Sequence, residues 1–231
     1  MRKGVKEKRF MFVYYFLYKD IFLLYRMTVL KIILLGDSNV GKTSFIRKYM
    51  KLNVPEKHNS TIGTAMFTKH IEYNNTSIDL RIWDTAGQER YASLTTLYYR
   101  SSNIVIIMYD VTNSQSFIRA KEYLLSIKSK GPDNIVIGLI GNKNDIVIEN
   151  PSNRAIPFSV GKEYADIHGI FFAETNSFSD NDAKSVFGNL LDLVPNDIIY
   201  SYTGESQSLL DKMIDDDNRN TNSNVSCCNI S

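Results

Sequence analysis

Cysteine, proline and tryptophan are scarce in this chain of 231 residues, which contains two, five and one of them, respectively. The two cysteines, Cys227 and Cys228, are adjacent and stand near the C-terminal end, which excludes a disulfide framework and a cysteine-rich metal site. An excess of one charge is also missing, because 27 basic residues face 25 acidic ones. We therefore expect no nucleic-acid partner, since such a partner requires a basic surface.

An uninterrupted apolar run of membrane-spanning length is also missing. The apolar run over residues 10–18 is followed by Lys19-Asp20, whereas a transmembrane helix needs about 20 apolar residues. No small-residue cleavage site of a signal peptide follows it. Because Met27 directly precedes the first predicted strand, we interpret residues 1–26 as a basic and apolar extension that is dispensable or not translated. An amphipathic membrane-surface helix and a membrane anchor are the alternatives.

The overall composition is that of a globular protein. Hydrophobic residues make up 43 % of the chain and charged residues 23 %, which is enough apolar material for one ordinary domain with flanking segments. We assign that domain to residues 27–197. Residues 198–231 are polar and read as a flexible tail; over residues 201–231, two Lys/Arg face five Asp/Glu.

Short apolar runs alternate with helical patterns from residue 30 onward. Strands are predicted over residues 30–35, 67–73, 76–83, 104–109, 135–140 and 170–173, and helices over residues 42–51, 91–98, 116–128, 160–168 and 181–193. Such alternation indicates a doubly wound α/β sheet with helices on both faces. The Asn74-Asn75 dipeptide predicts a hairpin, and with it one antiparallel edge strand.

One segment fits the pattern of a phosphate-binding loop. It lies between a predicted strand and a predicted helix, as such loops do, and reads Gly36-Asp37-Ser38-Asn39-Val40-Gly41-Lys42-Thr43. Backbone N–H groups from Asn39 to Thr43 are expected to surround phosphates at the helix N-terminus. Lys42 is expected to neutralise the β- and γ-phosphates and the Thr43 hydroxyl to bind Mg²⁺. We include Asp37, Ser38, Val40, Gly41 and Ser44 in the same nucleotide site.

A second segment predicts which base is bound. Asn142-Lys143-Asn144-Asp145 follows an apolar strand, at the sheet edge where open α/β folds bind ligands. The Asp145 carboxylate can accept both the ring N–H and the exocyclic amine of guanine, an arrangement that adenine cannot match. We therefore predict that Asp145 selects guanine, with Asn142 and Lys143 in the same site, and that the protein is not an ATPase.

Two further segments predict a switch. In Trp83-Asp84-Thr85-Ala86-Gly87-Gln88, Asp84 is expected to hold a Mg²⁺-bound water, the Gly87 amide to reach the γ-phosphate, and Gln88 to orient the attacking water as the catalytic residue. Thr61 offers a hydroxyl for Mg²⁺ and an amide for the γ-phosphate. Because both segments contact only what hydrolysis removes, we expect both to relax afterward.

Taken together, these motifs resemble the Rab branch of the Ras-like small GTPases over about residues 29–195. The resemblance also rests on Tyr98-Tyr99-Arg100 and Glu174-Thr175, and Arg90-Tyr91-Ala92-Ser93-Leu94 is most like the early-endosomal subgroup. It implies the P-loop small-GTPase fold, with a six-stranded, mostly parallel sheet. It also implies slow GTP hydrolysis, GTP/GDP and Mg²⁺ as cofactors, and recruitment of effectors to membranes in endosomal vesicular trafficking.

The resemblance implies a surface for effectors and shows departures near the base. Effectors of the family commonly contact an aromatic triad that maps here to Met66, Trp83 and Tyr98, beside Ile62. Near the guanine, Val54 replaces the usual aromatic residue, and Asn176-Ser177-Phe178 replaces a Ser-Ala-Lys loop. We place Ser177 and Phe178 in the nucleotide site and expect weaker or faster-exchanging nucleotide than is typical. Four extra residues near 148–151 are expected to form a surface loop.

The resemblance also accounts for the terminal cysteines and implies partners. Cys227 and Cys228 resemble substrates of Rab geranylgeranyl transferase, and two lipids give stable anchoring. Single prenylation of Cys228 and an unmodified pair are the alternatives. Implied partners of the monomer are a guanine nucleotide exchange factor, a GTPase-activating protein, a GDP dissociation inhibitor, a prenylation escort and effectors. The implied location is the cytoplasmic face of endosomal or other endomembranes, in exchange with the cytosol.

A competing interpretation keeps the fold and changes the activity. In it, the protein is a non-hydrolysing, nucleotide-dependent membrane scaffold that stays in one state and only binds partners. The retention of Gln88, Thr61 and Thr43 argues against this interpretation, whereas Val54, Phe178 and Met66 leave it open.

Overall fold

The computed structural model describes residues 28–53, 64–85, 99–176 and 179–199. The chain divides into two units, one of residues 29–71 and 79–195 and the other of residues 1–28, 72–78 and 196–231. In the second unit, the Thr28 hydroxyl donates a hydrogen bond of 2.7 Å to the carbonyl oxygen of Ile199. Within the described ranges, no helix combines the length and the apolar character that crossing a membrane requires.

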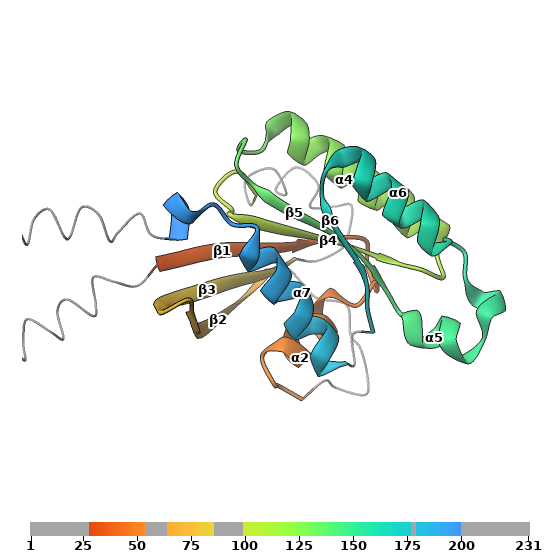
Figure 1. The fold of residues 1–231 in the computed structure, drawn as a ribbon. Helices are drawn as coiled ribbons and strands as arrows, with labels where there is room; N and C mark the ends of the chain where they lie inside the picture. Colours follow the sequence, from red (N-terminus) through yellow and green to blue (C-terminus); the bar gives the residue numbers. More distant parts are fainter. Residues whose placement is uncertain (1–27, 54–63, 86–98, 177–178, 200–231) are drawn as a thin grey trace, which may run out of the picture. The chain divides into compact units, whose positions relative to one another are not determined.

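A six-stranded sheet has the order β2-β3-β1-β4-β5-β6 (Figure 1). Its strands are β1 (Thr28–Leu35), β2 (Thr64–Tyr73), β3 (Thr76–Thr85), β4 (Ile104–Asp110), β5 (Val136–Asn142) and β6 (Phe171–Glu174). The pairs β1–β4, β4–β5 and β5–β6 are parallel. All residues of β4 and β5 are buried, as expected for central parallel strands whose sequence is a continuous apolar run.

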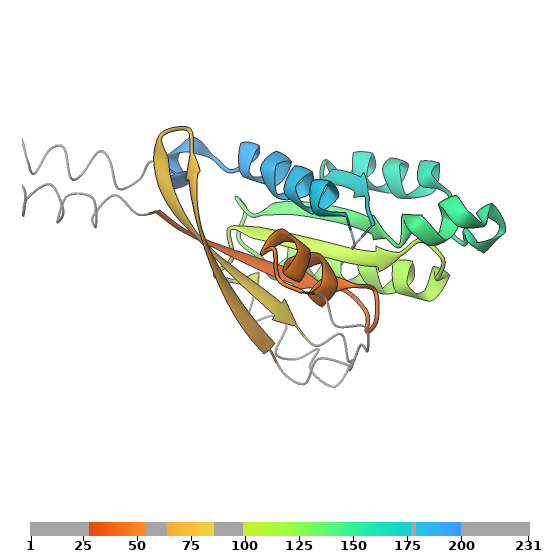
Figure 2. The same ribbon diagram turned by 90° about the horizontal axis from the view of Figure 1, so that it is seen from below.

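Strands β2 and β3 form the hairpin that the Asn-Asn dipeptide predicts (Figure 2). Asn74 has a φ of 47° and Asn75 a φ of 61°, so both central residues of the turn lie in the left-handed region. A two-residue turn of this kind matches the twist of antiparallel strands. The hairpin places β2 at one edge of the sheet, and the predicted antiparallel edge strand is confirmed.

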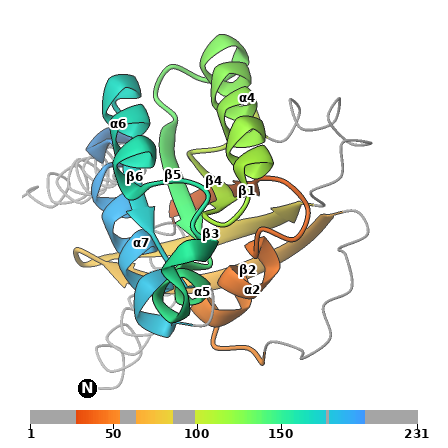
Figure 3. The ribbon, with the colours of Figure 1, turned by 90° about the vertical axis from the view of Figure 1, so that its right-hand side faces the viewer.

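Helices cover both faces of the sheet (Figure 3). Phe117 and Leu124 of α4 (Ser114–Lys130) and Ala165 of α6 (Phe158–His168) share one buried cluster with Val105 and Ile107 of β4. On the other face, Leu190 of α7 (Asp180–Asp192) packs over the α-carbon of Gly138. Helix α2 (Lys42–Tyr49) packs against α7 on that face. The doubly wound α/β architecture is therefore confirmed.

The structure differs from the sequence prediction mainly after β5. A short helix, α5 (Asn144–Glu149), and a 3-10 helix over Pro151–Asn153 fill the region where a surface loop is expected. Residues 148–151 are exposed as expected, Ile148 to 74 %, but this region is largely helical. The Asn150 side chain accepts the Ser152 N–H and caps the 3-10 helix. The predicted helix over residues 91–98 lies outside the described residues.

Aromatic stacking joins α2 to α7 and generates a stability prediction. Phe187 is buried, and its ring stacks on Tyr49 with centroids 3.7 Å apart and on Phe45 at 5.9 Å. Phe187→Ala leaves a cavity among these rings and should cost about 3–5 kcal/mol of unfolding free energy, measured by urea denaturation with saturating GDP. The matched control, Ile167→Ala at a side chain that is 73 % exposed, should change it by less than about 0.5 kcal/mol. Equal losses in the two variants would contradict this packing.

Candidate functional site

The loop between β1 and α2 has a backbone that few residues other than glycine tolerate. Gly36 has a φ of 146°, and a Cβ there would lie 2.2 Å from the carbonyl oxygen of Met108. Gly41, the N-cap of α2, has a φ of 100°, and Asn39 has a φ of 62°. Left-handed residues are a feature of backbone concavities whose N–H groups bind anions. This backbone is compatible with the predicted phosphate-binding loop.

Lys42 lies inside this loop. Its side chain is buried, and Nζ donates hydrogen bonds of 2.8 Å to the carbonyl oxygens of Gly36 and Asp37. Burial lowers the pKa of Lys42 to about 8, and the nearby charges of Asp84 and Asp37 oppose that shift. Desolvation costs the ammonium free energy that the carboxylates and carbonyls only partly offset. An anionic ligand in the loop would supply the missing charge.

Thr43 and Asp84 form a pair of oxygen donors beside the loop. The Thr43 hydroxyl donates a 2.6 Å hydrogen bond to Oδ2 of Asp84, at the end of β3. Asp84 is buried, and its Oδ1 has no hydrogen-bond partner among the described residues. Burial raises the pKa of Asp84, while the Thr43 hydroxyl and Lys42 lower it. A hydroxyl and an unsatisfied carboxylate oxygen are the hard donors that Mg²⁺ prefers, so these residues fit that ion.

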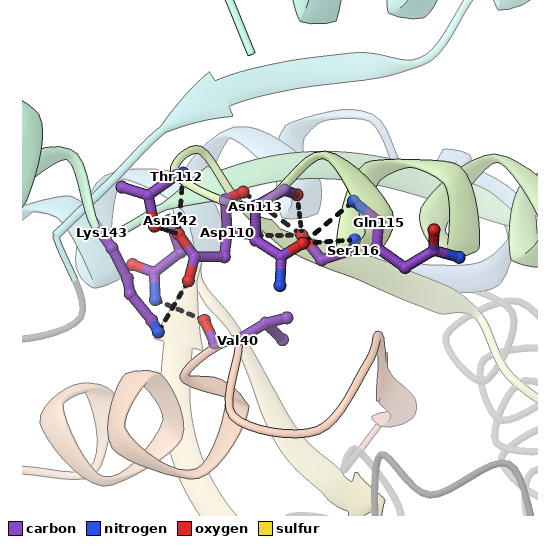
Figure 4. Close-up of polar contacts among 8 residues, drawn as sticks. All are labelled: Val40, Asp110, Thr112, Asn113, Gln115, Ser116, Asn142 and Lys143. Carbon is purple, nitrogen blue, oxygen red and sulfur yellow. Dashed lines mark hydrogen bonds and ion pairs between the residues drawn. The ribbon is translucent and has the colours of Figure 1, made fainter. Parts of the chain in front are cut away.

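Asn142 joins the phosphate-binding loop to the end of β5 (Figure 4). It is fully buried, and its Nδ2 donates a 2.7 Å hydrogen bond to the carbonyl oxygen of Val40. Its Oδ1 accepts a 3.3 Å hydrogen bond from the hydroxyl of Thr175, which follows β6. One side chain thus holds three loops that are far apart in the sequence.

Lys143 and Asp145 start α5 at the same edge of the sheet. Lys143 is the N-cap of this helix with a left-handed φ of 68°, and its Nζ lies 2.7 Å from Oδ2 of Asp110. Asp145 is in the first turn, and its side chain is half-buried. The N–H of Asn144 donates to the carbonyl oxygen of Thr175 at 3.1 Å, which holds the Asn142–Asp145 segment against the loop after β6.

Arg154 is a part of this region that the sequence does not reveal. Its guanidinium makes a two-bond salt bridge to the carboxylate of Glu174, at 2.6 and 2.8 Å, and donates a 3.0 Å hydrogen bond to Oδ1 of Asn144. The hydrogen bond to Glu174 raises the pKa of Arg154. Arg154 lies nine residues beyond Asp145, and no motif surrounds it in the sequence. Only its position in the fold indicates that it holds the Asn142–Asp145 segment against the end of β6.

Some predicted site residues are placed away from the loop, and others are not described. Met66 on β2 is 53 % exposed, and the half-buried Trp83 on β3 lies under the Lys31 ammonium, 5.3 Å from the ring centroid to Nζ. Ser44 lies buried in the first turn of α2. Residues outside the described ranges are Val54, Thr61, Ile62, Gly87, Gln88, Tyr98, Ser177, Phe178, Cys227 and Cys228. Among the described residues, no three His, Cys, Asp or Glu side chains gather as a metal cluster.

Comparison with known proteins agrees with this geometry. The sequence profile of the Ras family matches residues 31–196, which is more than half of the chain. The chain is also similar to the Ras-related protein Rab5A of Oryza sativa subsp. japonica, with 40 % identity over 157 residues. That alignment covers 68 % of this chain and 75 % of the rice protein.

The depressed pKa of Lys42 predicts a proton uptake on ligand binding. The pKa of Lys42 is about 8 in the free protein, and a bound diphosphate next to its ammonium raises that pKa. Above pH 8, Lys42 is therefore protonated in the complex but largely deprotonated in the free protein. At pH 8.5, binding of GDP should therefore take up more than about half a proton, and the affinity should fall as the pH rises above 8. Isothermal titration calorimetry in buffers of different ionisation enthalpy measures the uptake.

Two arginine variants serve as controls for that titration. Lys42→Arg removes the titrating group, because a guanidinium stays charged throughout this pH range, and should show no uptake at whatever affinity it retains. Lys184→Arg, at an exposed lysine of α7, should behave as the wild type. Binding of GDP to the wild type with no proton uptake would show either that the pKa of Lys42 is not lowered in the free protein or that its ammonium does not face the phosphates.

Proposed function

This chain belongs to the Ras family as a Rab-type small GTPase, and we propose that it binds GTP and GDP at the three loops that Asn142 joins and switches through the segments that carry Thr61 and Gly87. The protein hydrolyses GTP and acts as a switch in vesicular trafficking, and it is similar to the early-endosomal subgroup. The observation that carries the residue assignments is the buried Asn142–Val40 hydrogen bond, because it fixes the predicted base-binding loop against the predicted phosphate-binding loop. The non-hydrolysing scaffold is not favoured by these relationships.

The phosphates are assigned to the loop between β1 and α2. Lys42 supplies the positive charge for the β- and γ-phosphates, and the N–H groups of Asn39 to Thr43 donate to their oxygens. Asp37, Ser38 and Ser44 complete this part of the site. The ammonium is held by two carbonyl oxygens of its own loop, which support its position beside the phosphates.

Mg²⁺ is assigned to Thr43 and Thr61 directly and to Asp84 through water. The pair of oxygen donors that Thr43 and Asp84 form supports this assignment. When bound, the ion would neutralise negative charge on the phosphates. Thr61 and Gly87 would also reach the γ-phosphate through their amides, so their segments would lose a partner when that phosphate leaves.

Gln88 is assigned as the residue that orients the attacking water. Gln88→Leu removes both polar groups of the side chain and should slow single-turnover GTP hydrolysis at least tenfold, while GDP stays bound to the purified protein. The matched control is Gln115→Leu at an exposed glutamine of α4, which should leave the rate within about twofold. Chromatography of the released nucleotide measures both variants. Equal rates in Gln88→Leu and the wild type would remove Gln88 from the mechanism.

Asp145 is assigned as the guanine-selecting residue. Asp145→Asn replaces an oxygen acceptor by an amide donor, so GDP affinity should fall by about 10³-fold or more, and affinity for xanthosine diphosphate should rise because its C2 carbonyl accepts the new donor. Competition against a fluorescent nucleotide measures both. Asp166→Asn, at an exposed carboxylate of α6 that pairs with Lys162, is the control and should change neither affinity. If Asp145→Asn kept the wild-type preference for GDP over xanthosine diphosphate, a residue other than Asp145 would select the base.

We assign membrane and protein partners from the resemblance to the Rab family and from the exposure of side chains on β2 and β3. The exposed Met66 and the half-buried Trp83 on neighbouring strands support an effector surface, to which Ile62 and Tyr98 would contribute. Prenylation of Cys227 and Cys228 would anchor the tail of residues 198–231 to endosomal membranes. The proposed regulators are an exchange factor, a GTPase-activating protein, a GDP dissociation inhibitor and a prenylation escort.

A further inference from the structure

Asp110 is a charged side chain at the end of β4 that no nucleotide-binding motif includes. Its side chain is buried, and its Oδ2 forms an ion pair of 2.7 Å with Nζ of Lys143 (Figure 4). The register of the sheet sets Asp110 directly opposite Asn142 on β5, one residue before that lysine. The pair therefore links β4 to the base-binding segment.

The two carboxylate oxygens of Asp110 have different partners. Oδ1 accepts hydrogen bonds from the N–H of Thr112 at 2.9 Å and from its hydroxyl at 2.6 Å. Two local donors thus fix the rotation of the carboxylate and leave Oδ2 for Lys143. A charge-assisted bond to a fixed acceptor is stronger than a neutral one, and it holds a side chain that otherwise has four rotatable bonds.

The backbone of Asp110 is fixed by the start of α4. Asn113 caps this helix by accepting the N–H groups of Gln115 and Ser116. The Ser116 hydroxyl oxygen in turn accepts the N–H of Asp110 at 2.9 Å. The backbone that carries the carboxylate is therefore tied to the first turn of α4.

Lys143 is the residue whose side chain the ion pair with Asp110 holds in place. Its backbone has a φ of 68°, which is unfavourable for a side-chain-bearing residue, and its ammonium is partly exposed. We propose that Asp110 is a positioning residue: it holds the Lys143 side chain in the conformation that contacts bound guanine nucleotide and thereby slows nucleotide release. This inference rests on the proposed function, because it assumes that Lys143 contacts the nucleotide.

The test compares the release of a fluorescent GDP from the full-length protein after a chase with excess unlabelled GDP and Mg²⁺. Asp110→Asn removes the charge but keeps an oxygen that can accept the Thr112 N–H, so the turn is retained. Release should become about tenfold faster. In a Lys143→Met background the same substitution should have less than about a twofold effect, because the group that Asp110 holds is already absent.

The matched control is Asn113→Ala, which removes the side-chain cap of α4 but keeps the Ser116 hydroxyl that accepts the Asp110 N–H, so the Asp110–Lys143 pair stays intact. Its melting temperature should fall by about 3 °C while the release rate stays within about twofold. A purely structural role for Asp110 predicts the opposite pattern: equal acceleration by Asp110→Asn in both backgrounds, or acceleration by Asn113→Ala as large as that by Asp110→Asn. Either result overturns the proposal, as does an unchanged rate in Asp110→Asn.

Thr112→Val gives a second, milder variant that decides the question if Asp110→Asn does not fold. It removes only the hydroxyl that orients the carboxylate, and it should accelerate release by about two- to fourfold. A wild-type rate in this variant would contradict the proposal. Failure of the proposed function has a different signature, since the wild-type protein would then retain no guanine nucleotide at all.

Discussion

The site depends on the hydrogen bonds that hold the buried ammonium of Lys42. This ammonium lies within a loop of its own chain, held by the carbonyl oxygens of Gly36 and Asp37, and burial lowers its pKa to about 8. Burying this cation costs the fold free energy of desolvation. Bound phosphate would offset that cost by supplying a negative charge. The same loop needs glycine at position 36, because a Cβ there would lie 2.2 Å from the Met108 carbonyl oxygen.

The parallel sheet then brings the remaining loops to the same edge. Strands β1, β4 and β5 run in one direction, so the segments that follow their carboxyl ends meet there. Asn142 joins the phosphate-binding loop to Thr175, Asp110 holds Lys143, and Arg154 braces Glu174 against Asn144. These contacts hold the predicted base-binding segment and the predicted phosphate-binding loop at one edge of the sheet.

The sequence predicted the strands and revealed the motifs, but it did not reveal the ion pairs of Arg154 with Glu174 and of Asp110 with Lys143. Buried parallel strands are continuous apolar runs, and the phosphate-binding loop and the Asn142–Asp145 segment have fixed spacings, so each is visible locally. Arg154 and Asp110 are single residues whose partners lie 20 and 33 positions away, and no local pattern marks such pairs. The helical turns over Asn144–Glu149 and Pro151–Asn153 were missed because both are short and lack apolar periodicity.

The three loops that Asn142 joins form one site for a guanine nucleotide, and its selectivity can be measured. Isothermal titration of the nucleotide-free, full-length protein with GDP and with ADP, both in the presence of Mg²⁺, compares the two bases. Both ligands offer the same diphosphate to Lys42, so any difference in affinity comes from the base. We expect GDP to bind at least about 10³-fold more tightly than ADP. Equal affinities would show that the Asn142–Asp145 segment does not recognise the base and that the three loops do not form a guanine-selective site.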